Sequence, residues 1–291
     1  MKHILFCLGF ETFDKHLIEY VEKVPQLFSK AHLHFLHVYH PITSGVTELT
    51  SEQLKDYVQS LGFSKHSHTH FAVSDGSSAQ EILKYIEKKE IELVVLGKQN
   101  FSPGAGYIAS QLASRSPASL FLVTDDNLPR LEHLLFATDF SSCADYAYLE
   151  LMRLIQVVPS IKKISFLSTY NVPAGYFKSG FTYDDIAKQL KISIEKGLEE
   201  WLNRMPSIGT PKESIIEEEQ QGTAATILAV AERMDVDLIC MGSHGHSRLA
   251  SFLLGSTTDR MIRLHHQYPI FIARNPHDPE RKIIKNIFQV E

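Results

Sequence analysis

The stretch QQGTAATILAVAERMDVDLICMGSHG at residues 220–245 aligns, with one small gap, with SDGSSAQEILKYIEKKEIELVVLGKQN at residues 74–100. In both, a glycine with small polar neighbours precedes apolar residues at helical spacing, and a run of branched apolar residues then ends at a glycine. Apolar runs without polar alternation are typical of strands in a sheet that is covered on both faces. Each half of the chain is therefore predicted to contain a helix that leads into a buried parallel strand.

The repeat continues on both sides of these stretches. Three further pairs of segments match in the same order: KHILFCLGF (2–10) with EHLLFATDF (132–140), AHLHFLHVYHP (31–41) with KKISFLSTYNVP (162–173), and SPASLFLV (116–123) with YPIFIAR (268–274). A duplication is the simplest explanation of this order. With 291 residues, the chain also has the length expected of two domains.

The predicted fold class is α/β, with two tandem, doubly wound and mainly parallel five-stranded sheets. We expect a first domain at residues 1–127 and a second domain, with a C-terminal tail, at residues 128–291; the polar, turn-rich segment DDNLP lies near their boundary. In the second half the predicted strands are 134–138, 163–169, 214–219, 238–242 and 270–273, and the predicted helices are 144–157, 182–203, 223–234 and 257–264.

Composition indicates a globular protein and argues against several classes of partner. Lys and Arg number 29 against 34 Asp and Glu, a formal charge of −5, and no basic stripe is long enough to follow a nucleic-acid backbone. No apolar run approaches the length of a membrane span, and Glu11 and Asp14 follow the first apolar run too closely for a signal peptide. The widely separated thiols of Cys7, Cys143 and Cys240 indicate a reducing compartment. We therefore expect a cytoplasmic protein without nucleic-acid or membrane partners.

The segment GSHGHSRLASFLLGST at residues 242–257 follows a predicted strand. Glycine backbones tolerate conformations and close approaches that other residues resist, so amides at Gly242 and Gly245 can turn toward an anion. Gly255 then precedes two hydroxyl residues at a predicted helix start, where free N–H groups and the helix dipole favour a phosphate. Because doubly wound sheets bind ligands at the carboxyl ends of their strands, the segment is a candidate anion cradle.

The spacing Gly-x2-Gly-x9-Gly-Ser, carried by Gly242, Gly245, Gly255 and Ser256, resembles the nucleotide-binding signature of the universal stress protein family. An aspartate ends the first strand of the second half, and the duplication covers nearly the whole chain. The sequence is therefore similar to a tandem, E-type member of that family. The resemblance implies an adenine nucleotide alpha hydrolase-like fold, with ATP as the ligand and a divalent ion such as Mg²⁺ accompanying it.

The resemblance also implies roles for individual residues of the second half. Asp139 matches the acidic residue that hydrogen-bonds the adenosine part, Thr169 matches the position whose backbone faces the adenine, and Gly242 lies near the ribose. Tight turns beside a helix cap, with Asp139 as a capping carboxylate, are the alternative interpretation. The predicted nucleotide-binding residues are Thr138, Asp139, Thr169, Met241, Gly242, Gly245, His246, Gly255, Ser256 and Thr257.

The first half departs from the family pattern at both decisive places. Gly9 stands where the second half has Asp139, and the loop GKQNFSPGAGYIASQLASRS at residues 97–116 lacks the second spacing to a Gly-Ser pair. We therefore expect one nucleotide site per chain, in the second half, with the first half as its packing partner.

The expected function is that of an ATP-binding stress-response or regulatory protein whose output is a conformational or assembly change. A slow ATPase, with His244 as the base beside the glycines, and a nucleotide-independent interaction scaffold are the alternatives. Related proteins pair through their last strands, so SLFLV (119–123) and PIFIAR (269–274) are expected to pack together within one chain. The partner is an adenine nucleotide, and a homodimer or a protein partner is left open.

Three other features leave two interpretations each. His66, His68 and His70 share one face of a strand and form either a zinc site or solvated polar residues. The solvated strand is favoured, so no metal ligand is predicted. Cys143, near a helix start, is either a reactive thiol or a small packing residue. The segment 169–185 is either a lid over the nucleotide or a long connection.

His246 stands where related sequences commonly have a cationic residue. A histidine with the ordinary pKa of about 6.5 is mostly neutral in the cytoplasm and adds little charge for a phosphate. The affinity for a triphosphate should therefore rise as the pH falls from about 8 toward about 6. Calorimetric titration of the wild type and of His246→Ala checks this expectation, and a wild-type affinity that does not change with pH would contradict it.

Overall fold

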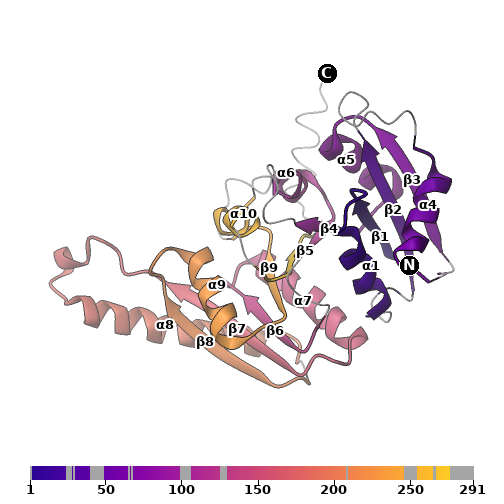
Figure 1. The fold of residues 1–291 in the computed structure, drawn as a ribbon. Coiled ribbons are helices and arrows are strands. Elements are labelled where there is room, and N and C mark those ends of the chain that lie inside the picture. The colour runs from indigo at the N-terminus through magenta and orange to yellow at the C-terminus, as the bar shows by residue number, and fades with distance from the viewer. Residues whose placement is uncertain are drawn as a thin grey trace.

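A ten-stranded, mostly parallel sheet forms the centre of the computed structural model and runs through both halves of the chain (Figure 1). The structure describes residues 2–23, 28, 30–39, 49–64, 66, 68–98, 106–124, 130–207, 209–245, 254–264 and 267–275. The strands are β1 (Lys2–Leu8), β2 (Ala31–Tyr39), β3 (Thr69–Asp75), β4 (Leu93–Lys98), β5 (Ser119–Thr124), β6 (His133–Ala137), β7 (Lys163–Tyr170), β8 (Lys212–Glu218), β9 (Leu238–Gly242) and β10 (Ile270–Ala273).

Helices cover both faces of this sheet, which explains why its inner strands are apolar without alternation. Residues of α1, α4, α7 and α8 belong to the core of one face, and residues of α5, α6, α9 and α10 belong to the core of the other. The helices are α1 (Asp14–Lys23), α4 (Ser51–Ser60), α5 (Ser78–Lys89), α6 (Tyr107–Arg115), α7 (Ser142–Val157), η1 (Tyr176–Ser179, a 3₁₀ turn), α8 (Tyr183–Arg204), α9 (Thr223–Met234) and α10 (Ser256–Arg263).

The strand order of each half is that of a doubly wound fold. The first half reads β3-β2-β1-β4-β5 and the second reads β8-β7-β6-β9-β10. All neighbours within a half are parallel. The order reverses between β1 and β4 and again between β6 and β9, so each half has one switch point. The predicted α/β class with five parallel strands per half is confirmed, and the two half-sheets are continuous with each other.

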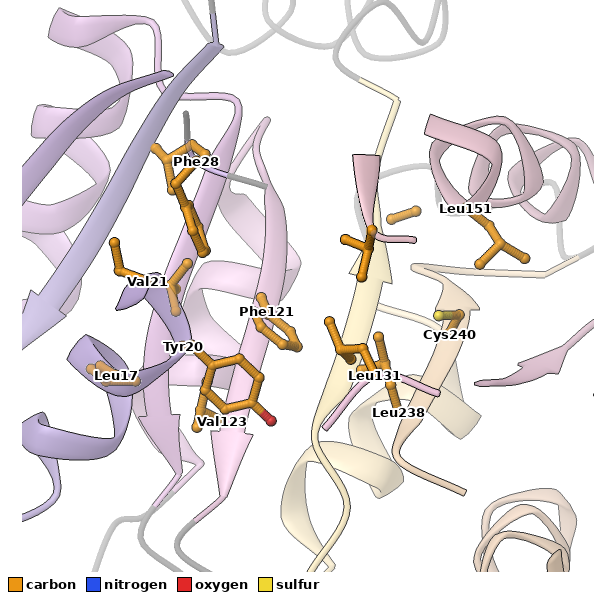
Figure 2. Packing of buried hydrophobic residues seen from close by; sticks show 14 of the residues in the cluster. Leu17, Tyr20, Val21, Phe28, Phe121, Val123, Leu131, Leu151, Leu238 and Cys240 are labelled. Carbon is orange, nitrogen blue, oxygen red and sulfur yellow. The ribbon is translucent and has the colours of Figure 1, made fainter. Parts of the chain in front are cut away.

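The half-sheets join where β5 and β10 pair in the antiparallel sense, as expected from the family resemblance. Phe121 lies opposite Phe271 at the centre of this seam. The core clusters on both faces contain residues from both halves. Figure 2 shows Tyr20 and Phe121 of the first half on one side of the seam and Leu131 and Leu238 of the second half on the other. The halves therefore bury a shared core.

Unusual backbone conformations repeat between the halves. Among the described residues, four non-glycine residues have a positive φ, and they form two equivalent pairs: Phe10 (61°) with Phe140 (64°), and Glu90 (52°) with Asp235 (47°). The first pair follows β1 and β6, and the second pair ends α5 and α9 as left-handed C-caps. Because residues with a Cβ seldom adopt this conformation, its recurrence at matched positions supports a duplicated unit.

The strands and helices predicted for the second half agree with the structure to within two residues at each end. Helix α7 begins at Ser142, two residues before the predicted start, because Ser141 is its N-cap and accepts a hydrogen bond from the backbone N–H of Ala144 at 3.3 Å. The expected boundary at residues 125–129 and the tail at 276–291 lie outside the described residues. No helix in the described part of the chain has the length and apolar character to cross a bilayer.

Arg274 links the end of β10 to α6 across the seam and is buried, with 5% of its surface exposed. Its guanidinium group donates hydrogen bonds to the carbonyl oxygens of Ala113 and, at 3.2 Å, Ser114 in the last turn of α6. Its backbone N–H donates to Ser119 Oγ at 3.1 Å. A cation is favoured at the carboxyl end of a helix dipole, so one side chain of the second half satisfies the end of a first-half helix.

Arg274→Met should lower the free energy of unfolding by about 2–3 kcal/mol, because it leaves buried carbonyl groups without their charged donor. Urea unfolding at constant pH measures the change. The matched control is Arg263→Met, since Arg263 is 60% exposed and pairs with Asp259 within the same helix; it should cause no measurable change. Equal effects of the two substitutions would contradict the role given to Arg274.

Candidate functional site

The switch point between β6 and β9 opens into a hollow of about 580 Å³ at the carboxyl ends of β6, β7 and β9. Ligands of doubly wound folds bind at such a position because neighbouring crossovers leave it in opposite directions. The described residues that line it are Ala137, Thr138, Asp139, Phe140, Ala144, Leu167, Ser168, Thr169, Ile194, Thr223, Ile227, Met241, Gly242, His244, Gly245, Gly255, Ser256, Thr257 and Thr258.

Every predicted nucleotide-binding residue that the structure describes lies in the wall of this hollow. They come from the ends of β6, β7 and β9 and from the start of α10: Thr138, Asp139, Thr169, Met241, Gly242, Gly245, Gly255, Ser256 and Thr257. His246, also predicted, lies outside the described residues.

Each glycine of the signature lies where an added Cβ would be tightly crowded by nearby atoms. A Cβ on Gly242 would come within 3.2 Å of the backbone at the start of α7, and a Cβ on Gly255 would lie 3.0 Å from the Cα of His244. A Cβ on Gly245 would overlap Asp139 Oδ2. Gly242 and Gly245 therefore allow the described residues that follow β9 to pack closely on α7 and on the turn after β6.

Asp139 lies in a tight turn between β6 and α7. Its Oδ1 atom accepts a hydrogen bond from the backbone N–H of Ser141 at 3.1 Å, and Thr138 Oγ1 accepts one from the backbone N–H of Phe140 at 3.1 Å. The N-cap of α7 is Ser141, so Asp139 supports the turn and does not cap the helix. This turn holds the carboxylate in the wall of the hollow.

The first turn of α10 faces the same hollow. Its N-cap, Gly255, provides no side-chain hydrogen bond to the helix. The hydroxyl group of Thr258 donates to the carbonyl oxygen of Gly242 at 3.1 Å, and the N–H of Gly255 donates to the carbonyl oxygen of Ser243 at 3.0 Å. These bonds fix the start of α10 against the end of β9, with the backbone donors of a helix N-terminus directed at the site.

Glu219 has a role that sequence reasoning missed. It follows β8, and its Oε1 atom accepts hydrogen bonds from the hydroxyl groups of Thr169 and Thr223, both at 2.6 Å. Both threonines line the hollow. The available signal was a carboxylate four residues before a helix start, where negative charge is favoured.

The apolar part of the wall was also missed. Leu167, Ile194 and Ile227 come from β7, α8 and α9. Their sequence patterns predict the strand and helices that contain them but do not assign them to the site. In the segment 169–185, which was interpreted as a lid or a connection, Thr169 is the one described residue that lines the hollow. Phe177 is 66% exposed. The structure therefore favours the interpretation of segment 169–185 as a long connection over that of a lid.

The first half has a counterpart hollow of about 380 Å³ at its own switch point. Phe13 occupies the position equivalent to Cys143 and lies against Gly97, where a Cβ would overlap the Phe13 ring. A large aromatic side chain therefore packs where the second half has a thiol. The two hollows share a location in the fold and differ in chemistry.

The Asp14 carboxylate organises the turn after β1, which borders the first-half hollow. Asp14 is buried and accepts hydrogen bonds from the backbone N–H groups of Gly9, Phe10 and Glu11 at 2.7–3.2 Å. The hydroxyl group of Tyr57 also donates to Asp14, at 3.0 Å. A buried carboxylate that already holds the local amides disfavours a phosphate at this position.

Another hollow, of about 290 Å³, lies at the seam and has mainly apolar walls. Glu150 in its wall pairs with Lys2 at 3.2 Å and also with Arg153. Glycine is absent from its described lining residues, whereas the second-half hollow combines a glycine loop with a helix N-terminus. We therefore place the candidate site at the second-half switch point.

Comparison with known families gives a match at this half of the chain. The model of the universal stress protein family matches residues 131–268. The second half of the chain belongs to the universal stress protein family. A universal stress protein of Methanocaldococcus jannaschii is 29% identical over 164 residues, which cover 48% of this chain and 93% of that protein. The site described above lies within the matched universal stress protein domain.

Solved structures resemble the whole chain. A universal stress protein from Archaeoglobus fulgidus has a TM-score of 0.62 at 18% identity and covers 94% of this chain and 96% of its own. A functionally unknown protein from Pseudomonas aeruginosa has a TM-score of 0.65 at 15% identity and covers 98% of both chains. At these identities the likeness shows the fold alone, and it extends the fold of universal stress proteins over both halves.

Histidines gather on one face of the first half-sheet, away from the candidate site. The register sets His3 beside His32 and His34 beside His70. The rings of His3 and His32 stack with centroids 4.7 Å apart, and those of His34 and His70 stack at 4.6 Å. His68 joins them at 4.7 Å from His32. We call His3, His32, His34, His68 and His70 the histidine cluster.

The histidine cluster is hydrogen-bonded internally. His3 Nδ1 lies 3.0 Å from His34 Nε2, and His34 Nδ1 lies 3.0 Å from the hydroxyl oxygen of Tyr85. The zinc interpretation of the 66–70 stretch gains no support, because no group of three or more metal-binding side chains in the described part of the chain is arranged to hold an ion. Of that stretch, His68 and His70 contact histidines of β2.

Burial lowers the pKa of His34 to about 4, and the neighbouring His70, His3, Lys89 and His32 add to the effect. Burial, with neighbouring histidines, also lowers the pKa of His32, and burial and Lys89 lower that of His70. The folded state thus favours neutral rings, whereas an unfolded chain protonates its histidines below about pH 6.5.

The unfolding free energy should therefore have its full value above about pH 6.5 and decrease as the pH drops toward about 4. His34 should account for about 1–2 kcal/mol of this decrease after allowance for solvent screening. Urea unfolding at a series of pH values measures the loss. His34→Gln should flatten this dependence, and His16→Gln, outside the histidine cluster, should retain it. An identical pH dependence in His34→Gln and wild type would contradict the prediction.

Proposed function

We propose that the second half of the chain binds one ATP molecule in the switch-point hollow, and that the protein acts as a nucleotide-dependent regulator in a stress response. The observation that carries this proposal is the convergence of the glycine loop, the first turn of α10 and the Asp139 carboxylate on one hollow. The membership of this half in the universal stress protein family supports it.

The start of α10 suits the phosphates. The first backbone N–H groups of a helix have no partner within the helix, and the dipole places partial positive charge beside them. Gly255 leaves this end without a side-chain cap, and the hydroxyl groups of Ser256 and Thr257 line the same hollow. A triphosphate would replace the missing cap with charge-assisted hydrogen bonds.

The opposite wall suits a nucleoside. The Asp139 carboxylate can accept hydrogen bonds from ribose hydroxyl groups, and Ile194 and Ile227 offer apolar surface for the faces of a purine. The backbone of Thr169 lies at the end of β7, next to this surface. Mg²⁺ would accompany the nucleotide chiefly through phosphate oxygens and water, as this ion usually does.

The first-half hollow is an unfavourable second site. Asp14 and Glu11 line it, and Asp14 already accepts the local backbone N–H groups. Phe13 packs on Gly97 in the same hollow. Anionic phosphates would approach carboxylates there, which supports a stoichiometry of one nucleotide per chain.

The regulatory output follows from differential binding. A nucleotide that binds one conformation of the glycine loop better than another shifts the population toward that conformation. A partner protein or a second copy that contacts the ordered loop would then respond to the nucleotide. Slow hydrolysis is the rival outcome, and single-turnover incubation followed by separation of ATP and ADP distinguishes it from simple retention.

Two substitutions at the first residue of α10 separate the backbone donor from the hydroxyl group. Proline is tolerated at a first helical position but lacks an N–H. Ser256→Pro should therefore weaken ATP binding about tenfold or more, and Ser256→Ala, which keeps the amide, should weaken it only about threefold. Isothermal titration calorimetry measures both affinities and the stoichiometry.

The matched control lies in the first half. Ser78 begins α5 after an extended N-cap residue and lines the first-half hollow, so Ser78→Pro makes the same change away from the proposed site. It should leave the affinity unchanged. Two equivalent ATP sites in the wild type, or an equal loss from Ser78→Pro and Ser256→Pro, would overturn the proposal. Mass spectrometry of nucleotide retained during purification identifies the base independently.

A further inference from the structure

His244 lines the second-half hollow, and the buried Cys143 lies directly against it. Cys143 Sγ is 3.0 Å from His244 Nε2 and 3.4 Å from His244 Nδ1. The two residues are 101 positions apart in the sequence and meet because β6 and β9 are neighbouring strands. A thiol at this distance from an imidazole can transfer its proton to the ring and become a thiolate beside an imidazolium.

The helix environment favours the thiolate. The N-cap of α7 is Ser141, its first residue is Ser142, and Cys143 is its second residue. The positive end of the helix dipole lies at this turn and stabilises negative charge on sulfur. The Cys143–His244 pair therefore combines a nucleophile, a proton acceptor and a stabilising field.

Glycines hold the pair in place. A Cβ on Gly242 would lie 3.1 Å from Cys143 Cβ, and a Cβ on Gly255 would lie 3.0 Å from His244 Cα. Larger residues at either position would push the thiol or the imidazole away. Two glycines of the signature, Gly242 and Gly255, thus also set the distance between the Cys143 sulfur and the His244 ring.

The pair borders space that a small molecule can enter. Cys143 is 8% exposed, and Ala144, Gly242 and His244 around it line the hollow of about 580 Å³. The equivalent position in the first half holds Phe13, so this chemistry belongs to the second half alone within the repeat.

The other two cysteines provide an internal reference. Burial, with the Asp14 carboxylate nearby, raises the pKa of Cys7 to about 12. Burial also raises the pKa of Cys240, which lies in the core near Leu238 (Figure 2). Both thiols stay protonated at neutral pH and are poor nucleophiles.

We infer that Cys143, with His244 as its proton acceptor, is a nucleophilic site for reversible modification by small disulfides. The Cys143 proton moves to His244 Nε2, and the thiolate attacks one sulfur of the disulfide. A new bond forms between Cys143 Sγ and that sulfur while the original S–S bond breaks. The leaving thiolate takes the proton from His244, so the reaction consumes one disulfide and releases one thiol.

An adduct at this position would occupy part of the hollow and exclude a nucleotide. This consequence rests on the proposed function, whereas the reactivity of the thiol does not. A rise in the concentration of small disulfides would then modify Cys143 and lower the fraction of the protein that has nucleotide bound.

The reactivity is measured on the full chain without nucleotide, using iodoacetamide and peptide mass spectrometry to resolve the three cysteines. Near pH 7, Cys143 should be alkylated about tenfold or more faster than Cys7 and Cys240, with a midpoint in its pH profile below about 8.5, the ordinary thiol pKa. His244→Gln should slow the reaction about tenfold at pH 6.5 and return the midpoint to about 8.5. A wild-type midpoint at or above that value, or an unchanged profile in His244→Gln, would overturn the inference.

Oxidised glutathione tests the disulfide class. It should form a mixed disulfide at Cys143 that dithiothreitol removes, and Cys143→Ser should abolish it; the absence of an adduct in the wild type would refute this class of reagent. Circular dichroism melting confirms that each variant is folded. In a separate arm, bound ATP should slow the alkylation. Unchanged alkylation in the presence of ATP that calorimetry shows to be bound would contradict a shared hollow without affecting the nucleotide proposal.

Discussion

The antiparallel pairing of β5 and β10 is the interaction on which the architecture depends. It turns two edge strands into central strands, and every residue of β5 is buried. Unpaired backbone groups at a sheet edge must otherwise be covered or protected. Because the cores on both faces continue across this seam, each half relies on the other for burial, and Arg274 adds a polar link at the same boundary.

The two halves show how one backbone supports different chemistry. Matched residues keep the same unusual φ values, so the turns have been retained while their side chains differ. Behind the first turn, Phe13 covers Gly97 and Asp14 holds the amides. Behind the second, Cys143 contacts His244, and the glycines Gly242, Gly245 and Gly255 line a hollow. The fold fixes where a site can form, and a few side chains decide whether one does.

Local patterns in the sequence predicted most of the fold and most of the described glycine, hydroxyl and carboxylate residues that line the second-half hollow. Apolar periodicity located the second-half elements, and glycine spacing identified the loop that the structure places at the switch point. Local sequence patterns did not predict the side-chain contacts between distant segments. The bridge from Thr169 to Glu219 to Thr223, the pairing of Cys143 with His244 and the histidine cluster all depend on strand register and order. A single strand's pattern does not contain that information.

The antiparallel seam also gives the molecule a direction. Strands are parallel within each half, so the carboxyl edges of the two halves, each with its hollow, face opposite ways across β5 and β10. The backbone is close to twofold symmetric, but its chemistry is not. A partner that recognises backbone shape alone meets two near-equivalent orientations, and the different side chains that line the two hollows distinguish one orientation from the other.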